Sequence, residues 1–129
     1  MPKVKWDFSG STSSRCVILG RGAAIDPLRG LLGSFFEECQ TIETKEAFCE
    51  CPASAPVALL LVTGTFPGGI DYSLLLAAKA KFRPSSTICI IAHMDPRAEI
   101  RLRSTGLAFL GSHVAFASQG RMVLDLLPP

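Results

Sequence analysis

A run of seven residues, Val57–Thr63, is apolar up to its last position and lies between Pro56 and a loop rich in glycine and proline. A strand with one face in solvent alternates apolar and polar residues, whereas a strand buried on both faces is apolar throughout. The run is too short for a helix and is bounded by residues that break secondary structure. It therefore predicts a buried strand of a parallel sheet, which places the chain in the α/β class.

The loop after this strand, residues 64–71, is the first place to expect a functional site. Ligands of open α/β sheets bind beyond the carboxyl ends of the strands. Thr63 ends the strand, and Thr65, Gly68 and Gly69 follow it. We therefore expect any site of this protein to include Thr63 and its loop.

Composition limits the classes of protein that need to be considered. The chain has 129 residues, 48% of them hydrophobic, which suits one domain with a buried core. A formal net charge of +2 gives no basis for a nucleic-acid partner. No apolar run approaches the ~20 residues of a membrane span, and no apolar signal segment begins the chain. We therefore expect a reduced, cytoplasmic protein, not bound to membranes, whose five cysteines are free thiols.

Short apolar strands alternate with amphipathic helices along the rest of the chain. Five consecutive β-α units predict a five-stranded parallel sheet with helices on both faces, a doubly wound three-layer sandwich. Residues 1–14 are expected to form a flexible tail and residues 15–129 a single domain. Strands are expected at residues 15–19, 40–43, 57–63, 87–92 and 107–110, and helices from residue 26 and at 44–51, 71–82, 95–105 and 114–127.

Two Asp-Pro pairs, Asp26-Pro27 and Asp95-Pro96, predict the starts of two helices. Aspartate is a good N-cap residue, and proline suits the first helical position. The first of these helices is expected to carry an apolar face as far as Phe36. Gly106 is expected to end the second one, because glycine readily adopts the left-handed conformation found after helices.

Three segments share an order and a spacing with one known family. Pro67 lies four residues after Thr63, the strand at 87–92 is followed by His93-Met94-Asp95, and Gly106 lies fifteen residues after Ile91. These segments resemble the third strand and its Asp-x-x-x-Pro-Gly loop, the fourth strand, and the start of the fifth strand in response-regulator receiver domains. The resemblance covers residues 15–127 and implies a flavodoxin-like fold with strand order 2-1-3-4-5.

The residues that carry the family's chemistry are replaced. The resemblance puts the phosphoacceptor aspartate at Thr63 and the acidic metal-binding pair at Gly20-Arg21. It puts the switch threonine or serine at Ile91, and the lysine at Ser112 or His113. Because Mg²⁺ prefers anionic oxygen ligands, Arg21 would repel it. The pattern resembles pseudo-receivers, which implies a regulatory module without catalysis, metal or cofactor that acts through protein–protein contacts.

The family's partner surface, formed by its fourth helix, fifth strand and fifth helix, falls on residues 95–105, 107–110 and 114–127. Arg97, Arg101, Arg103 and Phe109 are the candidate partner-binding residues. The last helix is expected to add Phe116, Met122 and Leu126 to this surface. The arginines fit a solvated helix face equally well. We expect a signalling partner or a symmetric homodimer there, since oligomers of one chain are most often two-fold.

A second hypothesis comes from a different functional class. Ligand binding or catalysis would use the rim formed by Gly20, Thr63 and His93. An anion could bind at Gly20-Arg21-Gly22, but Asp26 would oppose it, and a plain loop is the better explanation of these residues. His93 and Asp95 could act as an acid–base pair, but Asp95 is also expected to cap its helix. The spacing of Cys49-x-Cys51 is shorter than the usual metal-binding pair, and a structural role is expected.

Overall fold

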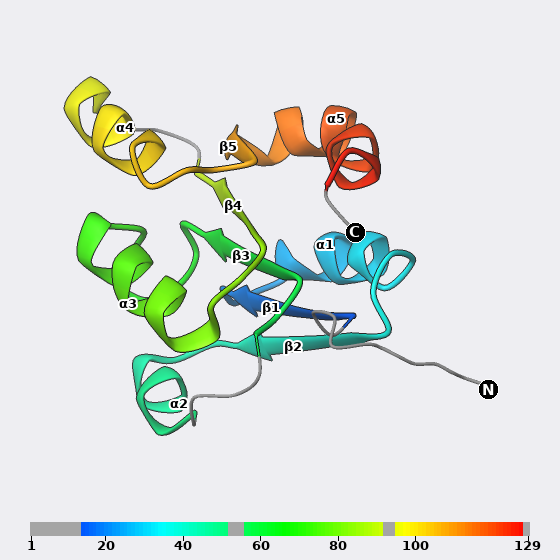
Figure 1. Ribbon diagram of the computed structural model, residues 1–129, viewed down its shortest axis with the longest axis horizontal. Coiled ribbons are helices and arrows are strands. Elements are labelled where there is room, and N and C mark those ends of the chain that lie inside the picture. The colour runs from blue at the N-terminus through cyan, green and yellow to red at the C-terminus, as the bar shows by residue number, and fades with distance from the viewer. Residues whose placement is uncertain (1–13, 52–55, 92–94, 128–129) are drawn as a thin grey trace.

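The computed structural model describes residues 14–51, 56–91 and 95–127, which form one five-stranded sheet and five helices (Figure 1). All neighbouring strands are parallel, in the order β2-β1-β3-β4-β5. This flavodoxin-like arrangement confirms the predicted fold class. The strands are β1 (Arg15–Leu19), β2 (Glu38–Ile42), β3 (Leu59–Thr63), β4 (Ser86–Ile90) and β5 (Phe109–Gly111), and the helices are α1 (Ile25–Leu32), α2 (Lys45–Glu50), α3 (Tyr72–Phe82), α4 (Pro96–Arg103) and α5 (His113–Asp125).

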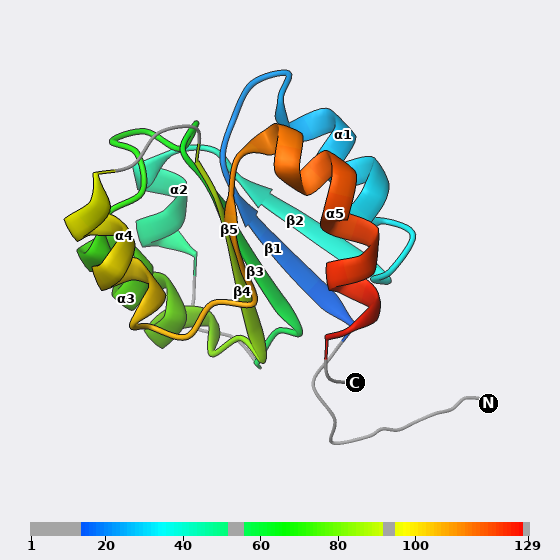
Figure 2. The same cartoon turned by 90° about the horizontal axis from the view of Figure 1, so that it is seen from above.

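The helices cover both faces of the sheet. Figure 2 shows α1 and α5 on one face and α2, α3 and α4 on the other. Every residue of β3 is buried, as the apolar run predicts. Leu60 packs toward α3 and Leu61 packs toward α1, so successive side chains supply two separate cores.

The two Asp-Pro helices begin differently from the prediction. In α1 the N-cap residue is Ala24, and Asp26 lies inside the first turn, where it forms an ion pair with Arg29 at 3.5 Å. A turn precedes the helix, with Ile25 N donating to Gly22 O, and this turn starts the helix before Asp26. Asp95 does hold the N-cap position of α4, but its side chain makes no capping hydrogen bond within the described chain. The prediction that the Asp95 carboxylate caps the helix is therefore wrong.

Helix α1 is also shorter than its apolar pattern suggests. It ends at Leu32, with Gly33 as the C-cap residue, and Phe35 and Phe36 lie beyond it. Both rings still pack against the core on the α1 side. Glycine is a poor helix former, which favours the end of the helix at this position. The two phenylalanine rings reach the core from the segment after the helix.

Four of the five strands have boundaries one or two residues away from the predicted ones. Strand β2 begins at Glu38 rather than residue 40, because the backbone N–H groups of Glu37 and Glu38 donate to Ser14 O. Ser14 is thereby joined to the sheet, while the rest of the predicted tail lies outside the described residues. Strand β5 covers Phe109–Gly111 rather than residues 107–110. Helix α4 ends at Arg103 with Ser104 as its C-cap residue, so Gly106, at φ +81°, lies beyond the helix end rather than directly after it as predicted.

Candidate functional site

The predicted site residues lie along one edge of the sheet. Gly20 follows β1, Thr63 ends β3, Ile91 follows β4 and Ser112 follows β5. Because all the strands are parallel, these positions are at their carboxyl ends. Backbone hydrogen bonds continue the pairing just past the strands, from Gly20 N to Ile42 O at 3.1 Å, Gly64 N to Ile90 O at 2.9 Å and Ile91 N to Gly111 O at 2.8 Å.

Two threonine side chains occupy the centre of this edge. Thr63 is 0% exposed, and its Oγ1 lies 2.6 Å from Thr65 Oγ1. The Thr65 N–H also donates to Thr63 Oγ1 at 3.3 Å, and the Arg21 N–H donates to Thr65 Oγ1 at 3.0 Å. Both hydroxyls are therefore engaged within the protein, and they join the loop after β1 to the loop after β3.

Thr65 was predicted only as a member of the loop after Thr63 and was given no role of its own, although its spacing from Thr63 is a recognisable signal. A threonine hydroxyl readily accepts a hydrogen bond from the backbone two residues later. The contact to Arg21, 44 positions away in sequence, depends on the fold.

Gly20 has no room for a side chain. A Cβ atom at this position would lie 2.3 Å from Thr63 Oγ1, 2.6 Å from Ile25 Cδ1 and 3.0 Å from Thr65 Oγ1. Ile25, the first residue of α1, is 2% exposed and belongs to the core on that face. The space beside position 20 is thus filled by a threonine and an isoleucine.

The other predicted site residues have local roles in this structure. The Arg21 side chain is exposed, so only its backbone takes part in the threonine network. Ile91 is half-buried beside Gly64. The Ser112 hydroxyl caps α5 by accepting from Ala115 N at 3.1 Å. His93 lies outside the described residues, so the structure does not place the proposed rim of Gly20, Thr63 and His93 as a whole.

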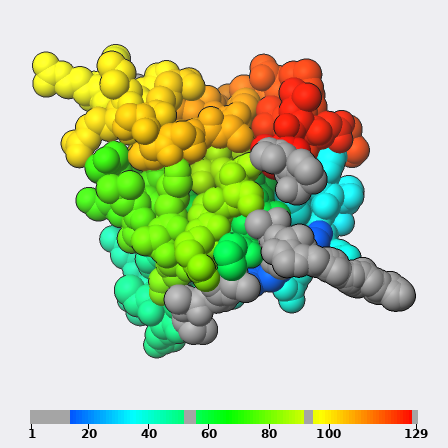
Figure 3. All heavy atoms as spheres, in the orientation of Figure 1, coloured from blue at the N-terminus to red at the C-terminus, as the bar shows by residue number. Residues whose placement is uncertain are grey.

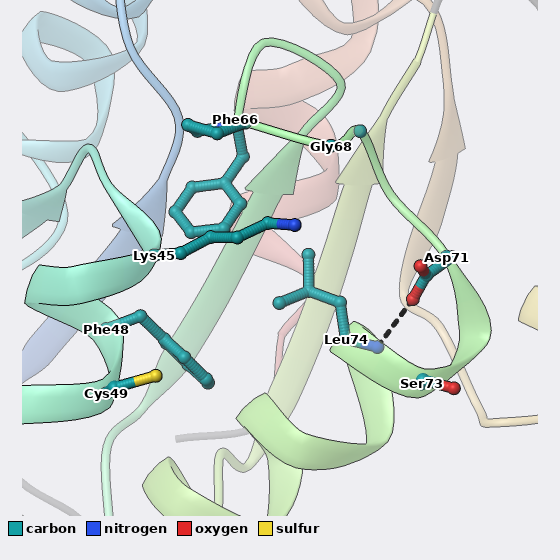
Figure 4. Close-up of a pocket in the computed structure, with 10 residues that line it drawn as sticks. Lys45, Phe48, Cys49, Phe66, Gly68, Asp71, Ser73 and Leu74 are labelled. Atoms are coloured by element: carbon teal, nitrogen blue, oxygen red, sulfur yellow. Dashed lines mark hydrogen bonds between the residues drawn. The ribbon is translucent and has the colours of Figure 1, made fainter.

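A hollow of about 280 Å³ lies beside this edge, between α2 and the loop after β3 (Figure 4). Figure 4 shows Lys45 extending across it toward Gly68, and a Cβ atom on Gly68 would lie 2.9 Å from Lys45 Nζ. Phe66, from the same loop, is buried and meets the Phe48 ring edge-on at 6.4 Å. Asp71 caps α3 by accepting from Leu74 N at 2.7 Å. The acidic group here thus has a structural role.

A larger hollow, of about 620 Å³, lies between α1 and α5. Its lining is mostly apolar, with His113 and Arg121 as its polar members. The Arg121 guanidinium lies over the Phe35 ring, 5.5 Å from its centroid. The family resemblance offered His113 as one of two positions for the receiver lysine, but the sequence did not predict this groove. The groove requires two helices separated by most of the chain to pack side by side.

The predicted partner surface is exposed only in part. Arg97, Arg101 and Arg103 are exposed on α4. Arg103 Nε lies 2.9 Å from Glu99 Oε2, and the Arg101 guanidinium lies 4.7 Å from the centroid of the Tyr72 ring.

Phe109 is half-buried and contacts the ring of Phe116 at 5.3 Å. Phe116, also predicted at this surface, is 0% exposed and belongs to the core, so its assignment to the surface is wrong. Large exposed apolar side chains do occur on or next to α4 and α5: Ile100, Val114, Met122 and Leu126.

The described part of the chain lacks two kinds of feature. Within residues 14–51, 56–91 and 95–127, no group of three or more His, Cys, Asp or Glu side chains is arranged to hold a metal ion. In the same residues, no helix has the length and apolar character needed to cross a membrane.

Comparisons with known proteins bear on the fold alone. No protein-family model and no curated protein matches this chain. One similar solved structure is a fusion of the yeast Spc42 trimeric coiled coil, amino acids 181–211, to another structure. The match has a TM-score of 0.58 at 16% identity and covers 89% of this chain and 79% of that one. An alignment of this extent reaches well beyond the coiled-coil segment, so the likeness is to a similarly folded α/β domain.

Proposed function

We propose that this chain is a receiver-like regulatory module of two-component-type signal transduction that is not phosphorylated and acts in the cytoplasm through protein–protein contacts. The observation that carries this proposal is the closed carboxyl edge of the sheet. There the Thr63 and Thr65 hydroxyls bond to each other, and Gly20 leaves no space for an acidic side chain. The flavodoxin-like strand order supports the family resemblance from which the proposal starts.

Phosphotransfer in a receiver needs a carboxylate nucleophile and carboxylates that hold Mg²⁺. Thr63 Oγ1 is neutral, is fully buried and shares hydrogen bonds with Thr65. A divalent cation at this edge would have hydroxyl oxygens near it and no acidic residue at position 20, a poor match to the ligands that Mg²⁺ prefers. These features support a module whose signalling does not depend on an acyl phosphate.

The outer surface of α4 and α5 is the proposed partner site. Both helices lie next to β5, at the end of the sheet farthest from β2 (Figure 1). On α4, Ile100 is 69% exposed, and Arg101 and Arg103 are exposed on the same helix; on α5, Val114 is 81% exposed. Exposed apolar groups with arginine around them match the composition of protein interfaces. The proposed partner is a signalling protein or a second copy of the chain, and neither nucleic acid nor membrane is required.

Incubation with acetyl phosphate and Mg²⁺, followed by intact mass measurement, tests the absence of phosphotransfer. We expect no adduct of about 80 Da, the mass of one phosphoryl group. Thr63→Val serves as the matched control, because it keeps the shape of the side chain and removes its hydroxyl. An adduct on the natural chain that disappears in Thr63→Val would contradict the proposal by identifying Thr63 as an acceptor. An adduct that hydroxylamine removes would contradict it by identifying an acyl phosphate.

A further inference from the structure

Two cysteines face each other across the first two strands. In the parallel pairing of β1 with β2, Cys16 is the register partner of Cys39. Neighbouring strands lie about 4.7–4.9 Å apart, and disulfides span Cα separations of roughly 4.4–6.8 Å. Both side chains pack on the α1/α5 face of the sheet. The pair is therefore spaced and oriented for a covalent bond without a change of register.

Polar contacts on the opposite face hold this register. Arg15 Nε forms an ion pair with Glu38 Oε1 at 3.2 Å, and Arg15 Nη2 donates to Gln40 Oε1 at 3.1 Å. These partners flank Cys39 in β2. At the start of the strand, the Glu37 N–H donates to Ser14 O at 2.9 Å. Contacts of the residues before and after Cys39 thus hold it opposite Cys16.

The two thiols are not equivalent. Cys16 is 0% exposed, while Cys39 is half-buried on a strand at the edge of the sheet. The thiols form a hydrogen bond with each other. Because Cys16 donates to the Cys39 sulfur, this bond lowers the pKa of Cys39 from 9.0 to about 7, and the pKa of Cys16 is raised well above its ordinary value. The accessible sulfur is thus the more nucleophilic one at neutral pH.

We propose that Cys39 and Cys16 form a peroxide-sensitive thiol pair, in which Cys39 is the sulfur that is oxidised and Cys16 is the resolving thiol. This modification site lies on the α1/α5 face, away from the closed edge at Thr63 and from the α4 surface. It is independent of the proposed regulatory function.

Oxidation takes place in two balanced steps, with a peroxide as the oxidant. The Cys39 thiolate attacks one oxygen of hydrogen peroxide, the O–O bond breaks, and the hydroxide that leaves takes up a proton to become water. Cys39 is then a sulfenic acid. The Cys16 sulfur attacks the sulfenic sulfur, the S–O bond breaks, and the departing hydroxide takes the Cys16 proton to form a second water. The disulfide that results is reduced again by an external thiol.

Other cysteines of the same chain provide internal comparisons. Cys89 in β4 is 0% exposed, and burial raises its pKa to about 12, so it should not react. Cys49 is exposed on α2, and no cysteine faces it across a strand pair. It can therefore be oxidised by solvent peroxide but has no resolving partner in the sheet. Cys49→Ser is thus the matched control for Cys39→Ser.

The test treats the reduced full-length chain with hydrogen peroxide, blocks free thiols and maps the peptides by mass spectrometry. We expect a linked peptide pair that contains Cys16 and Cys39, and an intact mass lower by about 2 Da, since a disulfide has two fewer hydrogens than two thiols. Dithiothreitol should restore the original mass. Cys49→Ser should behave as the natural chain does, and Cys39→Ser should lose the linked pair.

A second measurement keeps the proposal testable if a serine variant folds poorly. Dimedone, a trap for sulfenic acids, should label Cys39 in Cys16→Ser, where no resolving thiol remains. The proposal is overturned if peroxide leaves Cys16 and Cys39 unlinked in the natural chain. It is equally overturned if Cys39→Ser still gives the 2 Da loss, or if dimedone labels Cys49 and not Cys39 in Cys16→Ser.

Discussion

The carboxyl edge of the sheet and the outer surface of α4 and α5 differ in the side chains they present. At the edge, Thr63 is fully buried and no side chain fits at position 20. On the outer surface, Ile100 and Val114 are 69% and 81% exposed. In receiver domains the edge is polar and reactive, whereas here polar groups at the edge bond to each other. Apolar groups meet solvent instead at the two helices beside β5, and Figure 3 shows these helices along one border of the molecule.

This contrast indicates which region contributes to stability and which is free to contribute to binding. A partly buried hydroxyl pair and a close-packed glycine are costly to alter, because the surrounding side chains are closely packed. Exposed apolar side chains add little to folding, so those beside β5 are assigned to the proposed partner surface.

The largest effect is expected for Leu60→Ala, which empties a fully buried position of β3. Removing a buried leucine side chain costs about 2–5 kcal/mol of unfolding free energy. Leu126→Ala makes the same chemical change at a residue that is 78% exposed next to α5, and it should cost less than about 0.5 kcal/mol. Denaturant unfolding of both variants measures the difference. Equal costs would remove the distinction between the two regions.

A smaller loss is expected when the closed edge is overfilled by Gly20→Ala. The added methyl group would meet Thr63 Oγ1 and Ile25 Cδ1 at 2.3 and 2.6 Å. Overpacking of this kind costs about 1–3 kcal/mol. Gly30→Ala is the matched control, because nothing lies within 4 Å of its Cβ position in α1. That change should stabilise the chain by about 0.5–1 kcal/mol, since alanine is the better helix former. If Gly20→Ala is as stable as Gly30→Ala, the edge is open and the proposed function loses its main support.

Removal of the buried hydroxyl by Thr63→Val should cost about 1 kcal/mol, the usual net value of a hydrogen bond. The variant keeps its shape but leaves Thr65 Oγ1 with the Arg21 N–H as its remaining partner of the network. A double-mutant cycle with Thr65→Val isolates the interaction, and we expect a coupling of at least about 0.5 kcal/mol for two groups in contact. Strictly additive losses would show that the two hydroxyls do not stabilise each other.

The sequence predicted the fold more completely than it predicted the edge. The apolar run Val57–Thr63 predicts by composition alone that the strand is buried on both faces. The strand order came from the family resemblance. The prediction that Asp26 is the N-cap residue of α1 failed, because the turn at Gly22, which has φ +91°, starts the helix before the aspartate. Local rules cannot anticipate a turn that tertiary packing stabilises.

The threonine network and the cysteine pair were missed for a related reason. The sequence predicted that Gly20 and Thr63 lie at one edge of the sheet. It did not predict that Ile25 fills the space there, because this depends on how α1 packs against the sheet. Cys39 fell outside the predicted second strand, which was expected to begin at Gln40, so no register with Cys16 could be drawn. That strand begins two residues earlier because of hydrogen bonds to Ser14, a contact between segments more than 20 residues apart.

The smallest change in stability is expected for the double variant Arg101→Glu/Arg103→Glu on α4. The double change removes the contact of Arg101 with Tyr72 and the ion pair of Arg103 with Glu99. Exposed interactions of these kinds contribute about 0–1 kcal/mol each. Unfolding should therefore shift little, whereas binding at this surface should weaken clearly, because reversed charges repel a partner that arginine attracts. Light scattering measures self-association, and co-purification measures a heterologous partner.

Arg97→Glu shows whether binding depends on the total charge of α4 or on where along the helix the charge lies. Arg97 is exposed on the same helix, near its N-terminal end, and lines a small hollow of about 260 Å³ with Asp95 and Arg101. If binding follows total charge, Arg97→Glu should weaken it by about half as much as the double variant. If binding requires the surface toward β5, Arg97→Glu should have a smaller effect, because Arg101 and Arg103 lie in the last turn of the helix. Association that both variants retain in full would exclude α4 from the partner site. The exposed apolar residues of α5, Val114 and Met122, would then be the next positions to change.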